Sequence, residues 1–313
     1  MADKTIIVTG GAGFIGSHLC EKLLEGGNDK VFCVDNLITG KTENVKHLTK
    51  NPNLVFLRHD VSRPLKISGK IDRIYHLASP ASPVDYQKLP IETMMANSFG
   101  TKNMLDLAKE KKARILLAST SEVYGDPEKH PQNEDYWGHV NPVGPRSCYD
   151  ESKRFAEALA MAYHRIHGVN VRIARIFNTY GPRMRTNDGR VIPNFITQAL
   201  KNEPMTVYDG KQTRSFCYVS DMVDGLVRLM ESGFAAEPFN LGNPDERKII
   251  DVAKNIRQIT GSKSEIVFKP LPQDDPARRR PDISKSRKKL EWEPRIGFDD
   301  GLKKTIEWFS GNC

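Results

Sequence analysis

The sequence predicts an α/β fold with a doubly wound parallel sheet and a smaller C-terminal α/β lobe. Three observations lead to this fold class. Short β-branched runs alternate with longer helical patterns over residues 1–180, glycines recur directly after the first of these runs, and an acidic residue ends the second run. The chain of 313 residues is long enough to bury the core of one large domain or of two smaller ones.

The first part of the chain contains six runs that read as strands and three segments in which apolar residues recur at steps of three and four. Strand-like runs separated by amphipathic helices are typical of βαβ units around a parallel sheet. The predicted strands are 5–9, 31–35, 54–58, 73–77, 115–119 and 171–177, and the predicted helices are 14–25, 91–111 and 147–167.

The pattern changes after residue 177, where residues 178–190 lack a regular period and are expected to form a loop. The segment 270–281 is too rich in proline for a regular element. We therefore predict a first domain over residues 1–180 and a second lobe over 181–313, with some segments of the lobe returning to the first domain. In the lobe we expect helices at 191–201, 219–231 and 249–260 and a strand at 205–208.

The composition excludes several classes of protein. Lys and Arg number 47 and Asp and Glu 39, a net charge of +8 that is spread through the chain without clustered basic and aromatic residues, so no nucleic-acid partner is expected. A solvated basic surface or an acidic small ligand explains the excess equally well. Hydrophobic residues make up 38% and no apolar run approaches the ~18 residues of a membrane span, so we expect a soluble chain without a membrane partner.

The cysteines point to a reducing compartment. They are scattered, odd in number and form no CxxC pair, so neither a disulfide framework nor a metal site is expected. The first predicted strand begins almost at the N-terminus, which leaves no room for a secretion signal, and the expected location is the cytoplasm. The five residues are Cys20, Cys33, Cys148, Cys217 and Cys313.

A glycine-rich turn lies between the first predicted strand and the first predicted helix. Gly10, Gly13 and Gly16 are spaced G-x-x-G-x-x-G, with Phe14 and Ile15 inside the motif. Glycines at this place let the backbone turn tightly and approach a pyrophosphate, and the start of the helix presents free N–H groups to the anion. A turn made only for packing is the alternative, but the strand, the spacing and the helix together favour a Rossmann-type dinucleotide site.

Acidic residues close the second and third predicted strands. Asp35 can accept hydrogen bonds from the adenosine ribose hydroxyls and would repel a 2′-phosphate, so NAD is favoured over NADP. Asp60, followed by Val61, fits a group near the adenine amine, although an ordinary turn aspartate at a strand end would look the same.

Tyr149 and Lys153 lie four residues apart at the start of a predicted helix and therefore share one face of it. A neighbouring ammonium group favours the phenolate and is expected to lower the pKa of the tyrosine. Lys153 can also hold the nicotinamide ribose, and Thr120 and Ser121, after the fifth predicted strand, offer hydroxyls to the substrate oxygen. A chance pairing is the alternative, and the glycine motif upstream argues against it.

Longer segments give the chain a more specific resemblance. They are HLASPASP at 76–83, STSEVYGDP at 119–127, EDYWGHVNP at 134–142, GPRSCYDE at 144–151, RIFNTYGPR at 175–183 and RRRPD at 278–282. With the glycine motif and the Tyr149/Lys153 pair, the chain resembles the UDP-glucuronate decarboxylases of the extended short-chain dehydrogenase/reductase superfamily over essentially its whole length. The resemblance implies an NAD-binding Rossmann domain, a nucleotide-sugar-binding lobe, and an NAD site that also includes Asn36, Leu77, Ser79 and Asn97.

The resemblance also implies an activity, the conversion of UDP-glucuronate to UDP-xylose through a UDP-4-keto-pentose. Tyr149 takes the proton of the sugar 4-hydroxyl while hydride leaves C4 for NAD, and CO2 then leaves the 4-keto sugar. The resulting enolate is stabilised by Tyr149 with Thr120 or Ser121. Return of the same hydride regenerates NAD in each turnover.

Glu122, which has no aspartate before it, helps to distinguish the possible reactions of the family. Related 4,6-dehydratases carry an Asp-Glu pair after the threonine, and this chain has Ser121-Glu122. In this chain Ser121 replaces the aspartate of that pair, and the loss of this acid suits a reaction whose leaving group is CO2. The resemblance places Glu122 near C5 of the sugar. A glutamate that only hydrogen-bonds the following turn is the alternative.

Further substrate contacts follow from the resemblance. The residues implied are Arg279 in the RRRPD segment, Asn178 and Arg190 at the sugar nucleotide, and Arg214 at the diphosphate or ribose. For each of them, a surface salt bridge is the alternative.

One position departs from the family pattern, because the chain has Met94 and Met95 where a lysine commonly precedes the asparagine matched by Asn97. A homodimer through this helix and the helix of Tyr149 is expected by analogy. A 4-epimerase or 4,6-dehydratase of the same superfamily is the alternative enzyme, and a non-catalytic NAD-binding sensor or scaffold is the alternative from another class.

Overall fold

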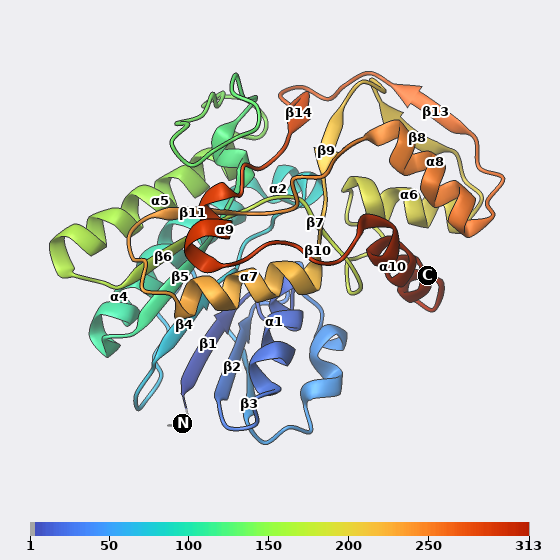
Figure 1. The fold of residues 1–313 in the computed structure, drawn as a ribbon. Coiled ribbons are helices and arrows are strands. Elements are labelled where there is room, and N and C mark those ends of the chain that lie inside the picture. Colours follow the sequence, from blue (N-terminus) through green and yellow to red (C-terminus); the bar gives the residue numbers. More distant parts are fainter. Residues whose placement is uncertain (1–3, 313) are drawn as a thin grey trace.

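The central sheet has seven parallel strands in the order β11-β6-β5-β4-β1-β2-β3 (Figure 1). The computed structural model describes residues 4–312. The order reverses direction between β1 and β4, which is the arrangement of a doubly wound Rossmann sheet, so the predicted fold class is confirmed. All six predicted strands are present to within one residue, as β1 Thr5–Thr9, β2 Lys30–Asp35, β3 Leu54–Arg58, β4 Arg73–His76, β5 Arg114–Thr120 and β6 Val171–Ile176.

The strands of the sheet are apolar along their length because helices cover both faces. Ile6, Ile7 and Val8 in β1 are fully buried. On one face, α4 and α5 pack with the alternate residues of β1, and α1 and α7 form part of the core on the other. The bounds of these helices are α1 Phe14–Leu24, α4 Thr101–Lys111, α5 Ser147–His167 and α7 Val219–Glu231.

The predicted helix 91–111 consists of three consecutive pieces. A π-helical turn separates two α-helical parts, and Asn97 in this turn donates from Nδ2 to Ser152 Oγ of α5 at 2.9 Å. This hydrogen bond ties the turn to the helix that carries Tyr149. The pieces are α3 Pro90–Met95, η2 Ala96–Gly100 and α4, and the short helices η1 Thr42–Leu48, α2 Pro83–Lys88 and η3 Ser121–Tyr124 lie in nearby connections.

The seventh strand of the sheet comes from the C-terminal part of the chain. In β11, Pro238–Leu241, Phe239 pairs with Ala174 of β6. The segment after it stays with the sheet, because Ser286 Oγ in α9, Ser284–Leu290, donates to Asn240 O at 2.7 Å. The strand patterns of the sequence did not predict β11.

The C-terminal lobe is smaller and less regular, at the upper right of Figure 1. It contains α6, α8 and α10, a parallel pair β8–β13 and a three-stranded sheet of order β12-β9-β14. The helices and the strand predicted for residues 181–313 are present, but α9, α10 and the strands β9, β10, β12 and β13 were missed. β7 lies in the segment expected to be a loop, and β14 lies in the segment 270–281, where no regular element was expected, because it pairs with β9. The bounds are β7 Thr179–Tyr180, α6 Val191–Leu200, β8 Met205–Tyr208, β9 Thr213–Ser215, β10 Cys217–Tyr218, β12 Glu246–Lys248, α8 Ile249–Thr260, β13 Ile266–Lys269, β14 Arg278–Arg279 and α10 Phe298–Ser310.

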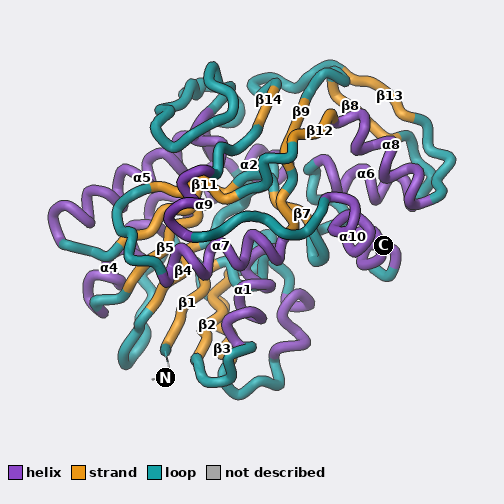
Figure 2. The backbone as a smooth tube through the Cα atoms, in the orientation of Figure 1, coloured by secondary structure: helices purple, strands orange, loops and turns teal. Residues whose placement is uncertain are grey.

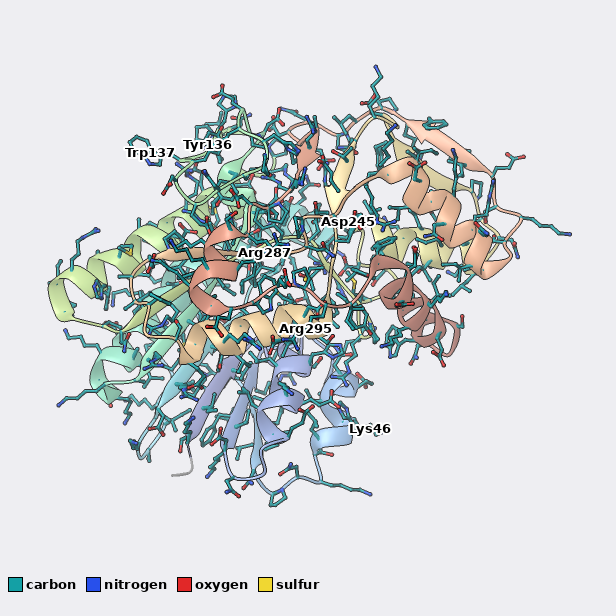
Figure 3. All side chains as sticks on the ribbon, in the orientation of Figure 1. Lys46, Tyr136, Trp137, Asp245, Arg287 and Arg295 are labelled. Carbon is teal, nitrogen blue, oxygen red and sulfur yellow. The ribbon has the colours of Figure 1, made fainter. Side chains whose placement is uncertain are left out.

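Long loops join many of the helices and strands (Figure 2). One of them, residues 126–146, runs from η3 to α5 and carries Tyr136 and Trp137 at the outer edge of the molecule (Figure 3), where Trp137 is 87% exposed. Over residues 4–312, no helix combines the length and the apolar character needed to cross a bilayer. The four cysteines in this range are buried and free, and Cys313 lies outside the described residues.

Candidate active site

A cavity of about 640 Å³ lies at the carboxyl ends of the sheet strands, where the strand order reverses. This crevice is the usual place for a ligand in an open parallel sheet. Both parts of the chain line the cavity, with Gly10 after β1, Thr120 at the end of β5 and Tyr149 on α5 from one part, and Arg214 from the lobe. Residues expected at the cofactor and at the substrate therefore share one cavity.

The glycine motif forms a tight cradle between β1 and α1, at the place where a pyrophosphate is expected to bind. Gly10 has a φ of +69°, and a Cβ atom there would lie 2.9 Å from the backbone N of Ala78 after β4. A Cβ on Gly16 would overlap the carbonyl oxygen of Gly10. Helix α1 starts at Phe14 with Gly13 as N-cap and no side chain capping it, so its first N–H groups can bind an anion. These features fit a dinucleotide.

Replacing Gly16 with Ala is expected to destabilise the protein by about 1–3 kcal/mol and to abolish NAD binding, because the loop must shift to accept the new methyl group. Thermal unfolding and NAD titration measure the two effects. Gly26→Ala is the matched control, since its Cβ would meet none of the described atoms within 4 Å. If the Gly16 variant bound NAD as tightly as the control, the cradle assignment would be wrong.

Asp35 lies at the end of β2, lines the cavity and is 7% exposed. Its oxygens accept hydrogen bonds from Leu37 N at 2.8 Å and Ala12 N at 3.0 Å, which fixes the carboxyl group beside the glycine motif. Burial raises its pKa, and these two hydrogen bonds oppose the rise. Each oxygen has a further lone pair available for a ribose hydroxyl.

Most of the other residues expected at the cofactor line the cavity as well. Asp60 lies beside Asn36, whose Nδ2 donates to Asp60 Oδ2 at 3.3 Å. Asn97 differs, because it is buried against Ser152 and is not among the described residues that line the cavity. Its position suits a residue that fixes α5 rather than one that contacts a ligand. Those that line the cavity are Gly10, Gly13, Phe14, Ile15, Gly16, Asp35, Asn36, Asp60, Val61, Leu77 and Ser79.

Tyr149 and Lys153 both line the cavity from one face of α5. The ammonium nitrogen of Lys153 lies 5.7 Å from the centre of the Tyr149 ring and donates to Ala118 O at 2.9 Å. Burial raises the pKa of Tyr149, although a hydrogen bond with the Thr120 side chain opposes this, and burial lowers the pKa of Lys153 to about 8. The expectation that Lys153 lowers the tyrosine pKa is wrong for this structure, because burial has the larger effect.

A second tyrosine supports Tyr149. The ring of Tyr86, from α2, is stacked on that of Tyr149 with centroids 5.0 Å apart and an interplanar angle of 7°. The guanidinium carbon of Arg146 lies 5.8 Å from the centre of the Tyr86 ring. Arg146 and Tyr86 were not singled out in the sequence, although Arg146 precedes Tyr149 by three residues and stands in one of the segments that carried the resemblance.

Glu122 is held between two arginines. Its Oε2 accepts from Arg146 Nη2 at 2.6 Å and from Arg279 Nη2 at 3.2 Å. Burial alone would raise the pKa of Glu122, but Arg279 and Arg146 outweigh it and lower the pKa to about 2. Glu122 is therefore a carboxylate at neutral pH and has no proton to donate.

The residues around Glu122 show how it is fixed. Ser121 lines the cavity, and its carbonyl oxygen accepts from Arg279 Nη1 at 2.7 Å. Arg279 is 1% exposed and lies outside the described lining, behind Glu122. This geometry allows Arg279 to act on a ligand through Glu122, whereas the resemblance implied a direct grip.

The remaining residues expected to contact the substrate line the cavity, but their side chains differ in how many hydrogen bonds hold them in place. Asn178 follows β6, while Arg190 pairs with both oxygens of Asp188, at 2.5 and 2.8 Å. Arg214 donates to Asp275 Oδ2 at 3.2 Å and to three backbone carbonyls. Asp275, on the proline-rich segment 270–281, was missed because it belongs to no regular element.

Met95 also lines the cavity, so the position of the expected lysine does face the site.

The chain is similar to proteins of a known family. The sequence model of the family described as GDP-mannose 4,6 dehydratase matches residues 7–305. UDP-glucuronic acid decarboxylase 1 of Danio rerio is 58% identical over 308 residues, which cover 98% of this chain and 73% of that protein. UDP-glucuronic acid decarboxylase 1 of Arabidopsis thaliana is 56% identical over 305 residues, with coverages of 97% and 69%.

Solved structures with the same fold hold related ligands. A variant of UDP-glucuronic acid 4-epimerase from Bacillus cereus, in complex with NAD and UDP-4-deoxy-4-fluoro-glucuronic acid, superimposes with a TM-score of 0.89 at 30% identity, covering 99% of this chain and all 100% of that one. A dTDP-glucose 4,6-dehydratase from Streptomyces venezuelae with NAD bound gives 0.90 at 29% identity, with coverages of 98% and 97%. The chain therefore belongs to the GDP-mannose 4,6-dehydratase family and, within it, to the UDP-glucuronic acid decarboxylases of the short-chain dehydrogenase/reductase superfamily.

Proposed function

We propose that this chain is an NAD-dependent UDP-glucuronate decarboxylase that forms UDP-xylose. The observation that carries the proposal is the state of Glu122, which two arginines keep ionised beside Tyr149 and Thr120. A 4,6-dehydratase carries an acid at the position of Ser121 to protonate the departing hydroxyl group, and neither Ser121 nor an ionised Glu122 supplies that proton. CO2 leaves without a proton, so a permanently charged Glu122 is compatible with decarboxylation.

The proposed roles follow from the positions in the cavity. Bound NAD supplies reversible hydride acceptance at C4 of the sugar. Tyr149 takes the proton of the 4-hydroxyl, with Thr120 also lining the cavity and Lys153 one helical turn away. When CO2 leaves, the electron pair of the broken C–C bond moves to the C4 oxygen, where Tyr149 and the hydroxyl of Thr120 or Ser121 stabilise the charge.

The pentose needs one proton at C5, and Glu122 has none to give at neutral pH. We assign Glu122 the role of orienting a water molecule toward C5, since a carboxylate accepts hydrogen bonds and its two arginines fix its direction. Arg279 supports this role from behind.

The product of purified protein incubated with UDP-glucuronate and NAD tests the function. We expect CO2 release and UDP-xylose, identified by NMR, with no net change in NADH because the hydride returns to the sugar. A 4-epimerase would instead yield UDP-galacturonate and no CO2. Unchanged substrate in the presence of NAD, or the epimer alone, would overturn the proposal.

We also propose that the chain forms a homodimer through the helices α3, η2 and α5. Several large apolar side chains on these helices are 44–74% exposed, which is unusual for a surface that meets only water. The exposed side chains are Ile91, Met94, Phe99, Phe155 and Ile166.

A reducing compartment, the cytoplasm, is proposed on the basis of the four free cysteines among residues 4–312.

A further inference from the structure

Five charged side chains in and behind the cavity wall form a continuous chain of ion pairs. Arg279 pairs with Glu122 at 3.2 Å, Glu122 with Arg146 at 2.6 Å, Arg146 with Asp275 at 3.3 Å, and Asp275 with Arg214 at 3.2 Å. We call these residues the charge chain. It joins β14, η3, the N-cap of α5, the segment 270–281 and β9, and four of its members line the cavity.

The charge chain starts and ends with arginine, so it holds three positive charges and two negative ones. Its side chains are between 1% and 24% exposed, and water screens the surplus charge poorly. Asp150 lies close enough to interact with Glu122, and burial and the charge of Glu122 raise its pKa, which favours its neutral form. Other arginines at the cavity are balanced one to one, such as Arg190 by Asp188.

Arg146 is the member of the charge chain with hydrogen-bonding capacity to spare. A guanidinium has five N–H donors, and Arg146 uses one bond to Glu122 and one to Asp275, while its Nε has no partner among the described residues. Arg279 lies outside the lining, and both terminal nitrogens of Arg214 are already bonded to the protein. The surplus charge is therefore most available to a ligand at Arg146.

Arg146 is also in the right place for one particular group of the substrate. It lies over the Tyr86 ring, which is stacked on Tyr149. If the sugar 4-hydroxyl meets Tyr149, the carboxylate on the neighbouring carbon, C5, is directed toward the adjacent wall, where Glu122 and Arg146 lie. Met95 also lines the cavity, at the position where a lysine is common in the family, and its neutral side chain offers no charge to this carboxylate.

We propose that Arg146, as the centre of the charge chain, binds the C5 carboxylate of the nucleotide sugar and sets the preference for a uronic acid over a neutral sugar. This inference rests on the proposed function. The carboxylate places a negative charge beside Arg146, whereas UDP-glucose has a neutral CH2OH group there and leaves the Arg146 guanidinium without this partner.

Binding of UDP-glucuronate and UDP-glucose tests the proposal. Calorimetry with saturating NAD, in a Tyr149→Phe background that blocks turnover, gives both dissociation constants. Arg146→Met is expected to weaken UDP-glucuronate about tenfold or more, the size of a hydrogen bond to a charged group, and to change UDP-glucose by less than about twofold. Asp275→Asn removes a negative charge from the charge chain and is expected to shift the preference the other way, toward UDP-glucuronate.

Asp274→Asn is the matched control, because Asp274 is the neighbouring carboxylate, contacts Asn141 at 3.1 Å and takes no part in the charge chain. The ratio of its dissociation constants for UDP-glucuronate and UDP-glucose should equal that of the Tyr149→Phe protein. Equal weakening of both ligands by Arg146→Met would show a role at the diphosphate or in folding, and would overturn the proposal, as would an unchanged preference in Asp275→Asn. The proposed function fails separately, if the wild-type protein binds UDP-glucuronate but does not convert it.

Discussion

Replacing Tyr149 with Phe is expected to lower kcat by about 10²–10⁴-fold, the contribution typical of a positioned general acid–base group. The phenolic hydroxyl is lost, while the ring that stacks on Tyr86 is kept. The glycine cradle and Asp35 are untouched, so NAD affinity should remain. Steady-state kinetics with UDP-glucuronate and an NAD titration measure the two quantities.

Tyr163→Phe is the control for this experiment. It removes a hydroxyl from the same helix, α5, where Tyr163 hydrogen-bonds only with Asp106 at 2.7 Å among the described residues. Its kcat should stay within about twofold of the wild type. If Tyr149→Phe lost less than about tenfold in kcat, the proton would be handled by another group and the roles of Tyr149 and Lys153 would need reassignment.

Replacing Glu122 with Gln is expected to lower the free energy of unfolding by about 3 kcal/mol at pH 7. This figure corresponds to the fall in the Glu122 pKa from 4.5 to about 2 that Arg279 and Arg146 cause against the effect of burial. The variant would also leave two buried guanidinium groups without the charge that balances them.

The effect of Glu122→Gln should depend on pH in one direction. Because the folded protein has the lower pKa, the ionised form stabilises the fold fully above about pH 4.5, and this contribution disappears as the pH falls toward 2. Urea denaturation of wild type and variant between pH 7 and pH 3 should therefore show a converging difference. Glu128→Gln, on the exposed part of the following loop, should show no such difference. If the difference in unfolding free energy between wild type and Glu122→Gln stayed constant with pH, the ion pairs would be ruled out as its cause.

The sequence could predict the part of the site that depends on local spacing. The glycine motif, Asp35 and the Tyr149/Lys153 pair each follow from a strand end, a helix start or one helical turn, and the structure brings all of them to one cavity. Residues set by long-range contacts could not be predicted in this way. Asp275 reaches Arg146 from a segment without periodicity, and β11 is a short strand that is recognisable only beside β6.

The direction of the Tyr149 pKa shift shows a second limit of prediction from the sequence. The neighbouring ammonium is evident from the sequence, but the degree of burial is not, and burial decides the sign here. In the same way, the RRRPD segment identifies Arg279 as important, yet only the packing shows that Glu122 lies between it and the cavity.

The late strand β11 has a consequence for how the protein is made. Until the ribosome has released residues beyond Leu241, β6 has no neighbour on its outer side, and its free N–H and C=O groups can pair with a strand of another nascent chain. Premature termination or proteolysis between the two strands would leave that edge open for good, so shortened products should accumulate as aggregates rather than as a working dinucleotide-binding half.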